Sequence, residues 1–194
     1  MDFKERLAMI RKAYQKEMPR LREQWESGDR GRMDPYFVDW IPMFTPIEMS
    51  VWQDIRSAGL PLLPQVPALQ YFIDFANPFE KIAIECDGKA WHDEEKDAKR
   101  DAALMAEGWT IYRITGSECN RIRPAPWEFD ESDHTEESRY GIAREFFLTT
   151  ATGIMFAIGH IHFPRPDGRS KTAEKYFALM LETLILHSPN RRAA

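Results

Sequence analysis

The chain has 194 residues, of which 43% are hydrophobic and 29% charged, and its formal net charge is −5 at pH 7. This composition fits a globular protein with one substantial core. It argues against a disordered chain and against a protein whose whole surface binds nucleic acid. Two cysteines, Cys86 and Cys119, are too few for a disulfide scaffold or a zinc site, so we expect both to be reduced. The first residues are charged throughout, unlike a signal peptide, and no apolar run is long enough to span a bilayer. We therefore expect no membrane association and a cytoplasmic location.

A helix is predicted over residues 3–26, because apolar side chains recur there at spacings of three and four. Pro19 lies inside this segment, so a break or a kink is expected there. Basic side chains crowd the other faces of the helix. They form either an ordinary solvated face or a surface that contacts phosphate groups.

A second helix is predicted over residues 45–57, with Thr45 as its N-cap, Pro46 at its first position and Gly59 at its end. Glu48 stands three residues after Thr45, which is the spacing of a capping box in which the carboxylate bonds back to the N-cap amide. Glu48 therefore has a structural explanation, and a catalytic role is the alternative.

Strands are predicted in the middle of the chain. Residues 60–67 are expected to be extended, and their prolines suit an edge strand. Residues 71–76 and 81–87 are predicted to form two strands joined by a short turn, and residues 109–115 a further strand. A helix over residues 93–107 precedes the last of these strands.

The C-terminal third is predicted to be helical. Residues 124–134 contain prolines and acids, which is typical of a linker or surface loop. Helices are predicted over residues 135–150 and 170–187, whereas residues 151–163 are ambiguous between a strand and a buried helix. As a strand, this last segment would place its two histidines on one face, but no third metal ligand lies nearby in the sequence.

Together these elements predict an α/β protein with a mixed sheet of about four strands flanked by helices. We expect an N-terminal helix and loop over residues 1–35 and a core over residues 36–123. A C-terminal helical extension over residues 124–194 is expected to pack on that core.

Carboxylates stand on the central hairpin where strands ordinarily carry apolar or neutral side chains. Asp74 lies between Ile73 and Phe75 on the first strand, and Glu85 and Asp87 share one face of the second. The short turn brings Asp74 close to Glu85, with the register left open. Like charges held this close repel unless a cation or a proton relieves them, and oxygen-only ligands favour a hard cation such as Mg²⁺. The alternative is that these acids line the wet face of a two-sided hairpin.

The pattern of Asp74 and then Glu85-x-Asp87, with Glu48 on a preceding helix, resembles the PD-(D/E)xK nuclease superfamily, which has the restriction-endonuclease-like fold. Within it, the branch of the very-short-patch-repair (Vsr) endonucleases is the more similar, over about residues 48–119. The further positions of the resemblance are IDF at 73–75, IECDG at 84–88, Trp91, His92, Asp97, Arg100, Asp101, Leu104, Gly108, Trp109, Tyr112 and Arg113.

The resemblance implies metal-dependent hydrolysis of DNA phosphodiester bonds, with Mg²⁺ as the cofactor and Mn²⁺ as its substitute. Asp74 and Glu85 would be metal ligands, together with the backbone carbonyl of Cys86. Glu48 would ligate the metal directly or through a water molecule.

The residue that orients the attacking water is open, because Asp87 stands where the superfamily usually has a lysine. Lys89, two residues further along, could reach back to the site. His92 lies in a segment that resembles the one in which the repair endonucleases place a histidine as base. A neutral histidine can accept a proton from water at physiological pH.

Several basic residues follow the acidic ones. Arg113, on the last predicted strand, either steadies the acidic cluster or contacts DNA. Arg121 and Arg123 come after that strand and are expected to contact phosphates. Asp97 and Arg100 lie three residues apart on the predicted helix and are expected to form a structural ion pair.

DNA is thus the expected partner. Cutting both strands would need a homodimer or two sequential nicks, and a larger defence or repair assembly is compatible with the sequence. The alternative function is a nucleic-acid-binding module on the same fold with weak or lost catalysis, acting as a subunit of a larger system. The departure at Asp87 keeps that alternative open.

Overall fold

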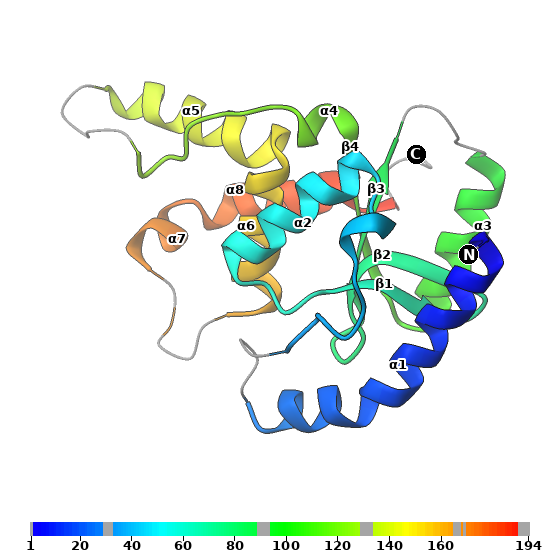
Figure 1. Cartoon of the computed structure of the whole chain (residues 1–194). Helices are drawn as coiled ribbons and strands as arrows, with labels where there is room; N and C mark the ends of the chain where they lie inside the picture. Colours follow the sequence, from blue (N-terminus) through cyan, green and yellow to red (C-terminus); the bar gives the residue numbers. More distant parts are fainter. Residues whose placement is uncertain are drawn as a thin grey trace.

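A four-stranded mixed sheet with helices on both faces forms the centre of the molecule (Figure 1). The computed structural model describes residues 2–28, 33–88, 94–128, 134–164, 168 and 170–189. The strands lie in the order β1 (Leu63–Ala68), β2 (Tyr71–Asn77), β3 (Ile82–Asp87) and β4 (Thr110–Thr115). The predicted α/β fold is confirmed, and it is consistent with the restriction-endonuclease-like fold.

The strand pairing fixes which residues meet at each end of the sheet. β1 and β2 are antiparallel, and so are β2 and β3, with Phe75 opposite Ile84. β3 and β4 are parallel, with Glu85 beside Arg113. Because parallel strands cannot be joined by a tight turn, a helix, α3 (Glu94–Ala106), lies in the connection between them. The charged ends of β3 and β4 therefore lie together.

Helices α1 (Phe3–Glu26) and α3 cover one face of the sheet. α1 begins at a capping box formed by Asp2 and Glu5. It continues through Pro19 without a break, and Figure 1 shows that the helix curves along its length. Of the two alternatives, the break is excluded and a kink at Pro19 stays a prediction. Tyr14 and Leu21, on either side of the proline, are both buried against the sheet and hold the helix in place.

Helices α2 (Pro46–Ala58), α5 (Glu136–Thr149), α6 (Ala151–His162) and α8 (Phe177–His187) form a common apolar core with the other face of the sheet. The C-terminal helices and the central sheet thus bury their apolar side chains together. The described part of the chain also contains three shorter helices: η2 (Ile41–Met43), α4 (Gly116–Cys119) and α7 (Lys171–Lys175).

Residues 151–163, which the sequence left ambiguous between a strand and a helix, are helical, because nearly all of them belong to α6. His160 and His162 therefore do not lie on one face of a strand. His162 Nε2 instead lies 2.6 Å from the Tyr112 hydroxyl, and His160 Nδ1 lies 3.0 Å from the Phe156 carbonyl oxygen.

The helix predicted over residues 170–187 is divided in two at Tyr176, which has non-helical backbone angles between α7 and α8. Tyr176 is buried, and its ring packs on that of Phe147 with 5.9 Å between centroids. Core packing of this side chain therefore overrides the helical pattern.

Among the described residues, no single helix has the length and apolar character needed to cross a membrane. α5 and α6 meet those criteria only as a pair, and their axes bend by 89° at the break between them.

The sharp turn between α5 and α6 depends on Gly153. Thr150 bridges the two helices, since its hydroxyl donates to the Phe146 carbonyl at 2.7 Å and accepts from the Gly153 amide at 3.0 Å. A Cβ atom at Gly153 would lie 2.2 Å from the Phe146 carbonyl oxygen, so the helices cross too closely for any side chain there.

We therefore expect Gly153→Ala to lower the free energy of unfolding by about 1–3 kcal/mol, because the backbone must shift. Gly141→Ala, in α5, is the matched control: an added Cβ would meet nothing within 4 Å. Its higher helix propensity should leave stability unchanged or raise it by up to about 1 kcal/mol. Urea unfolding followed by circular dichroism measures both, and equal effects would contradict the close crossing.

Candidate functional site

The N-terminus of α2 is fixed by the predicted capping box. The Thr45 hydroxyl accepts from the Glu48 amide at 3.3 Å, and the Glu48 carboxylate accepts from the Thr45 amide at 2.5 Å. Gly59, with φ of +65°, ends the helix. The capping role of Glu48 is thus confirmed, and its role as a metal ligand stays a prediction.

Gln65 is a neighbour of Glu48 that sequence reasoning missed. Its side-chain amide donates to Glu48 Oε1 at 2.9 Å, so both oxygens of this buried carboxylate accept hydrogen bonds. Gln65 lies on β1 with φ of +48°, in the left-handed region that residues other than glycine seldom adopt. No pattern in the sequence distinguishes such a glutamine from its neighbours.

Asp74 and Glu85 lie at the same end of the sheet as Glu48. Continuing the β2–β3 register from Phe75 and Ile84 places Asp74 opposite Glu85. Asp74 is half-buried and its Oδ2 accepts from the Cys86 amide at 2.8 Å, whereas Glu85 is buried. The fold therefore brings together the two carboxylates that the hairpin pattern selected.

The electrostatics of this pair are unfavourable for two negative charges. Burial raises the pKa of Asp74 well above its usual range, and the charges of Glu85 and Glu48 raise that pKa further. The Cys86 amide and Arg100 act in the opposite direction. Burial likewise raises the pKa of Glu85 to about 7 even though Arg100 lowers it. The pair therefore favours a bound proton or a bound cation.

Arg100 of α3 supplies a cation to this pair from within the protein. Its Nη2 donates to the Glu85 carboxylate and, at 2.9 Å, to the Phe72 carbonyl oxygen, while its buried Nε has no hydrogen-bond partner. The sequence suggested Asp97 as the partner of Arg100, and that pairing stays a prediction. The contact with Glu85 depends on how α3 packs on the sheet, which spacing along the helix does not reveal.

A second, buried charge cluster lies beside the first. Arg113 Nη1 donates to Asp87 Oδ1 at 2.6 Å, and its Nε and Nη2 donate to the two oxygens of Asp101 at 3.0 and 2.9 Å. Arg113 is only 5% exposed. Of its two alternatives, steadying the acidic cluster is the one that this placement favours. We call these three residues the buried triad.

Lys89 and His92 lie outside the described residues, so which of them orients the attacking water stays a prediction. Cys86 directs its side chain to the other face of the sheet, where it packs against the core around α2. Burial, and then the charge of Asp74, raise the pKa of its thiol well above the usual range, so the thiol stays protonated. The backbone carbonyl of Cys86 as a metal ligand stays a prediction.

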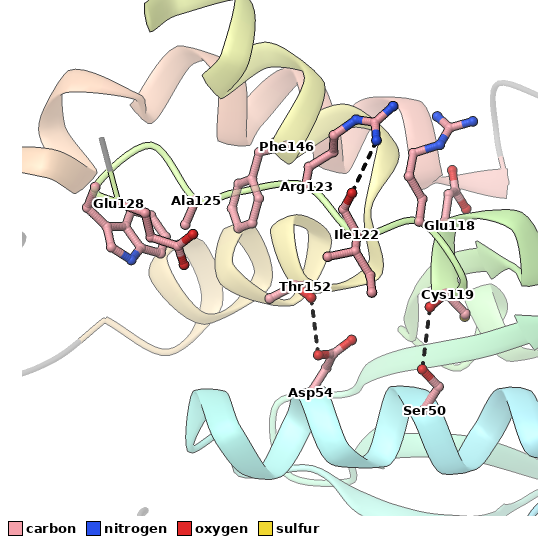
Figure 2. Close-up of a pocket in the computed structure, with 12 residues that line it drawn as sticks. Ser50, Asp54, Glu118, Cys119, Ile122, Arg123, Ala125, Glu128, Phe146 and Thr152 are labelled. Atoms are coloured by element: carbon pink, nitrogen blue, oxygen red, sulfur yellow. Dashed lines mark hydrogen bonds between the residues drawn. The ribbon is translucent and has the colours of Figure 1, made fainter. Parts of the chain in front are cut away.

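Arg121 and Arg123 line a groove that does not include Asp74 or Glu85. Both are exposed, and Arg123 Nε bonds to Glu145 at 2.6 Å. The groove, of about 410 Å³, lies between α2, α6 and the segment that follows β4 (Figure 2). Their contact with phosphate groups stays a prediction.

The chemistry of the donors fits a hard cation, although the protein offers few of them. Among the described residues, no group of three or more His, Cys, Asp or Glu side chains is placed to hold a metal ion. Asp74 and Glu85 nevertheless provide carboxylate oxygens only. Mg²⁺ in proteins commonly has one or two carboxylate ligands and keeps several waters, so the pair matches the number of carboxylates that such a site commonly uses.

Comparison with known proteins covers the same part of the chain. Residues 47–127 match the family model REase_MTES_1575, a restriction-endonuclease-like family. A protein of Haemophilus influenzae, described only as uncharacterized, is 36% identical over 83 residues, which are 40% of this chain and 69% of that protein. No solved structure matches the chain significantly. The matched span includes Glu48, Asp74, Glu85 and the buried triad.

Arg113→Ala should lower the free energy of unfolding by about 3–5 kcal/mol, because it leaves two buried carboxylates without their cation. Arg144→Ala is the matched control, since Arg144 bonds to Glu182 at 3.0 Å on the surface, where both side chains are about half exposed. That pair should contribute at most about 1 kcal/mol. Urea unfolding compares the two variants. An Arg113→Ala variant as stable as Arg144→Ala would refute the structural role of the buried triad.

Glu85 should make stability depend on pH. Because its pKa is raised from 4.5 to about 7 on folding, the native state binds more protons than the unfolded state between these values. The free energy of unfolding should therefore fall as pH rises across this window, by about 3 kcal/mol at 1.36 kcal/mol per pKa unit, and then level off. Glu85→Gln should reduce this slope and leave the part due to Asp74.

The measurement is chemical unfolding at several pH values with a chelator present, so that no divalent cation competes with the proton. Superimposable pH profiles for the wild type and Glu85→Gln would contradict the raised pKa of Glu85.

Proposed function

The chain belongs to the restriction-endonuclease-like family REase_MTES_1575, and from this we propose that it is a metal-dependent endonuclease that hydrolyses DNA phosphodiester bonds. Family membership indicates a nuclease. The metal, the DNA substrate and the finer assignment to the PD-(D/E)xK superfamily and its Vsr-like branch belong to the proposal. The observation that carries it is the pair Asp74 and Glu85, two adjacent carboxylates whose pKa values are both raised.

Each residue of the pair has a definite part in the proposal. Asp74 and Glu85 would hold Mg²⁺, with Mn²⁺ as a substitute, and the Cys86 carbonyl and water would complete the ligands. A bound Mg²⁺ supplies activation of a water for attack on phosphorus and neutralisation of the charge that develops there. Glu48 adds negative charge at Asp74 while its own position is fixed by Thr45 and Gln65.

The surrounding charges keep the pair in place. Arg100 holds Glu85 by its Oε1 oxygen. The buried triad ties β3 and β4 to α3 through Asp87, Arg113 and Asp101, which holds the ends of the two strands together beside the site. Lys89 or His92 would orient the water, and Arg121 and Arg123 would contact phosphates of the DNA.

The proposal is tested by incubating the purified chain with supercoiled, linear double-stranded and single-stranded DNA in Mg²⁺ or Mn²⁺. Wild type should cut at least one form and stop on addition of a chelator. Asp74→Asn should reduce the rate at least about a hundredfold, because it removes a ligand worth several kcal/mol of charge stabilisation. Glu137→Gln changes an exposed acid on α5 and should cut like wild type. Equal cutting by Asp74→Asn, or no cutting of any form by wild type, would refute the proposal.

One observation favours the alternative, a nucleic-acid-binding module with weak or lost catalysis that acts as a subunit of a larger system. Glu85 and Asp87 each already accept from a guanidinium group, so part of the negative charge is neutralised without a metal. Isothermal titration with Mn²⁺ in the absence of DNA separates the two functions. The nuclease should bind the metal in a way that Asp74→Asn weakens, whereas the binding module should bind DNA and show no such metal site.

A further inference from the structure

The groove beside α2 is a second candidate site, separate from the carboxylates. Asp54 and Ser50 of α2 face it from below in Figure 2, where Asp54 accepts from the Thr152 hydroxyl at 3.2 Å. Ser50 donates to the Cys119 carbonyl at 3.5 Å and closes one end. The volume of the groove, about 410 Å³, lies within the range of small-molecule sites, about 300–1,000 Å³.

Trp127 gives this groove an exposed aromatic surface held in a fixed position. Its ring stacks on Phe156 with 4.6 Å between centroids and meets Phe146 edge-on at 5.6 Å. Even so, 45% of the residue remains exposed. A tryptophan ring that is packed on one side and open on the other is the kind of platform on which nucleobases stack.

The charges of the groove suit a ligand that is flat and uncharged at one end and anionic at the other. Arg121 is exposed, and Arg123 is held by Glu145 and by the Ile122 carbonyl at 3.2 Å. Glu118 also lines the groove, and its two oxygens already have partners: Oε1 lies 2.9 Å from His187 Nε2, and Oε2 accepts from the Thr115 amide at 2.7 Å.

The other acids of the groove, Asp54 and Glu128, lie away from the guanidinium group of Arg123 in Figure 2. Burial raises the pKa of Asp54, against the effect of its hydrogen bond to Thr152. Glu128 follows Trp127 in the sequence and lies at the other end of the groove from Glu118 in Figure 2. An anionic group is therefore best accommodated at the arginine end and a neutral ring at the Trp127 end.

Helix α2 connects this groove to the carboxylate site. Glu48 in its first turn lies beside Asp74, and Ser50 and Asp54 further along line the groove. Six residues of helix correspond to about 9 Å along the axis, which is within the reach of a few nucleotides. The groove residues of α2 therefore begin within two turns of helix of Glu48.

We propose that this groove binds one unpaired nucleotide, with its base stacked on Trp127 and its phosphate on Arg121. The inference rests on the proposed function and narrows its substrate to DNA that carries an unpaired segment near the cleaved bond. The base must be unpaired because both faces of a base within a duplex are covered by its stacked neighbours. A free nucleotide and a nucleotide within a strand share this chemistry.

The test uses the full chain with a chelator present, so that binding is measured without cleavage. Fluorescence anisotropy follows a labelled single strand of about 12 nucleotides, a length within the usual range of single-strand sites. The same sequence is measured as a duplex, and deoxynucleoside monophosphates serve as competitors. If the monophosphates compete, a free nucleotide is sufficient for binding. If they do not compete, the site requires a nucleotide within a strand.

Trp127→Leu should weaken single-strand binding about tenfold, and Trp127→Phe should retain it within about threefold, because leucine keeps the packing on Phe156 but lacks an aromatic face. Tyr140→Ala removes another exposed aromatic ring, from α5, and should change nothing. Arg121→Ala should weaken binding and reduce the slope of affinity against salt concentration by about one. Arg144→Ala is its control and should leave the slope unchanged.

Equal binding of the single strand by wild type and Trp127→Leu would overturn the inference. So would a loss of affinity in Tyr140→Ala as large as that in Trp127→Leu, or a loss in Trp127→Leu that is as large for the duplex as for the single strand. Thermal unfolding of each variant shows whether a loss of binding comes from a loss of folding. If Trp127→Leu does not fold, binding by Trp127→Phe and Arg121→Ala tests the inference in its place. Cleavage by wild type is assayed separately. Binding that depends on Trp127 in a chain that cuts no DNA would leave this site standing and refute only the proposed nuclease.

Discussion

Two guanidinium groups make the acidic end of the sheet possible. Arg113 compensates Asp87 and Asp101, and Arg100 compensates Glu85, so that carboxylates from one strand and one helix can be buried side by side. Without these cations the desolvation of the acids would oppose the pairing of β3 with β4. Asp74 differs from the other acids, because its Oδ2 accepts from a backbone amide, that of Cys86, and its side chain remains half-buried. An external cation would therefore stabilise the Asp74 carboxylate more than the other acids.

The arrangement separates support from chemistry along one strand. At Asp87, β3 is tied to its neighbours by the buried triad, and two residues earlier, at Glu85, it faces Asp74. Since alternate residues share a face, the same backbone that positions the triad also sets the distance between the two carboxylates. Helix α2 contributes similarly, because the capping box that starts it also fixes the charge of Glu48 near Asp74. Local structural interactions thus hold the candidate site in place.

The parts of the fold that could be read from the sequence are those specified by local interactions. The cap of α2 follows from Thr45 and Glu48 alone, and the meeting of Asp74 with Glu85 follows from a short turn between two strands. The contacts made by Arg100 and Gln65 could not be read, because they depend on how elements distant in the sequence pack. Residues 151–163 were ambiguous for a different reason. A segment that is apolar on nearly every side has no periodicity, and the local signal is its N-cap, Thr150.

The conformation of β1 has a consequence for self-association. This strand forms one edge of the sheet, and an exposed edge is normally a template on which a strand of another molecule can pair. Pro64 and Pro67 have no amide hydrogen to donate, and Gln65 between them has a left-handed backbone that interrupts the extended geometry. The edge is therefore protected against continuous sheet formation and against the aggregation that follows from it. Two copies of this chain that come together on DNA would have to meet through a surface other than the edge of β1.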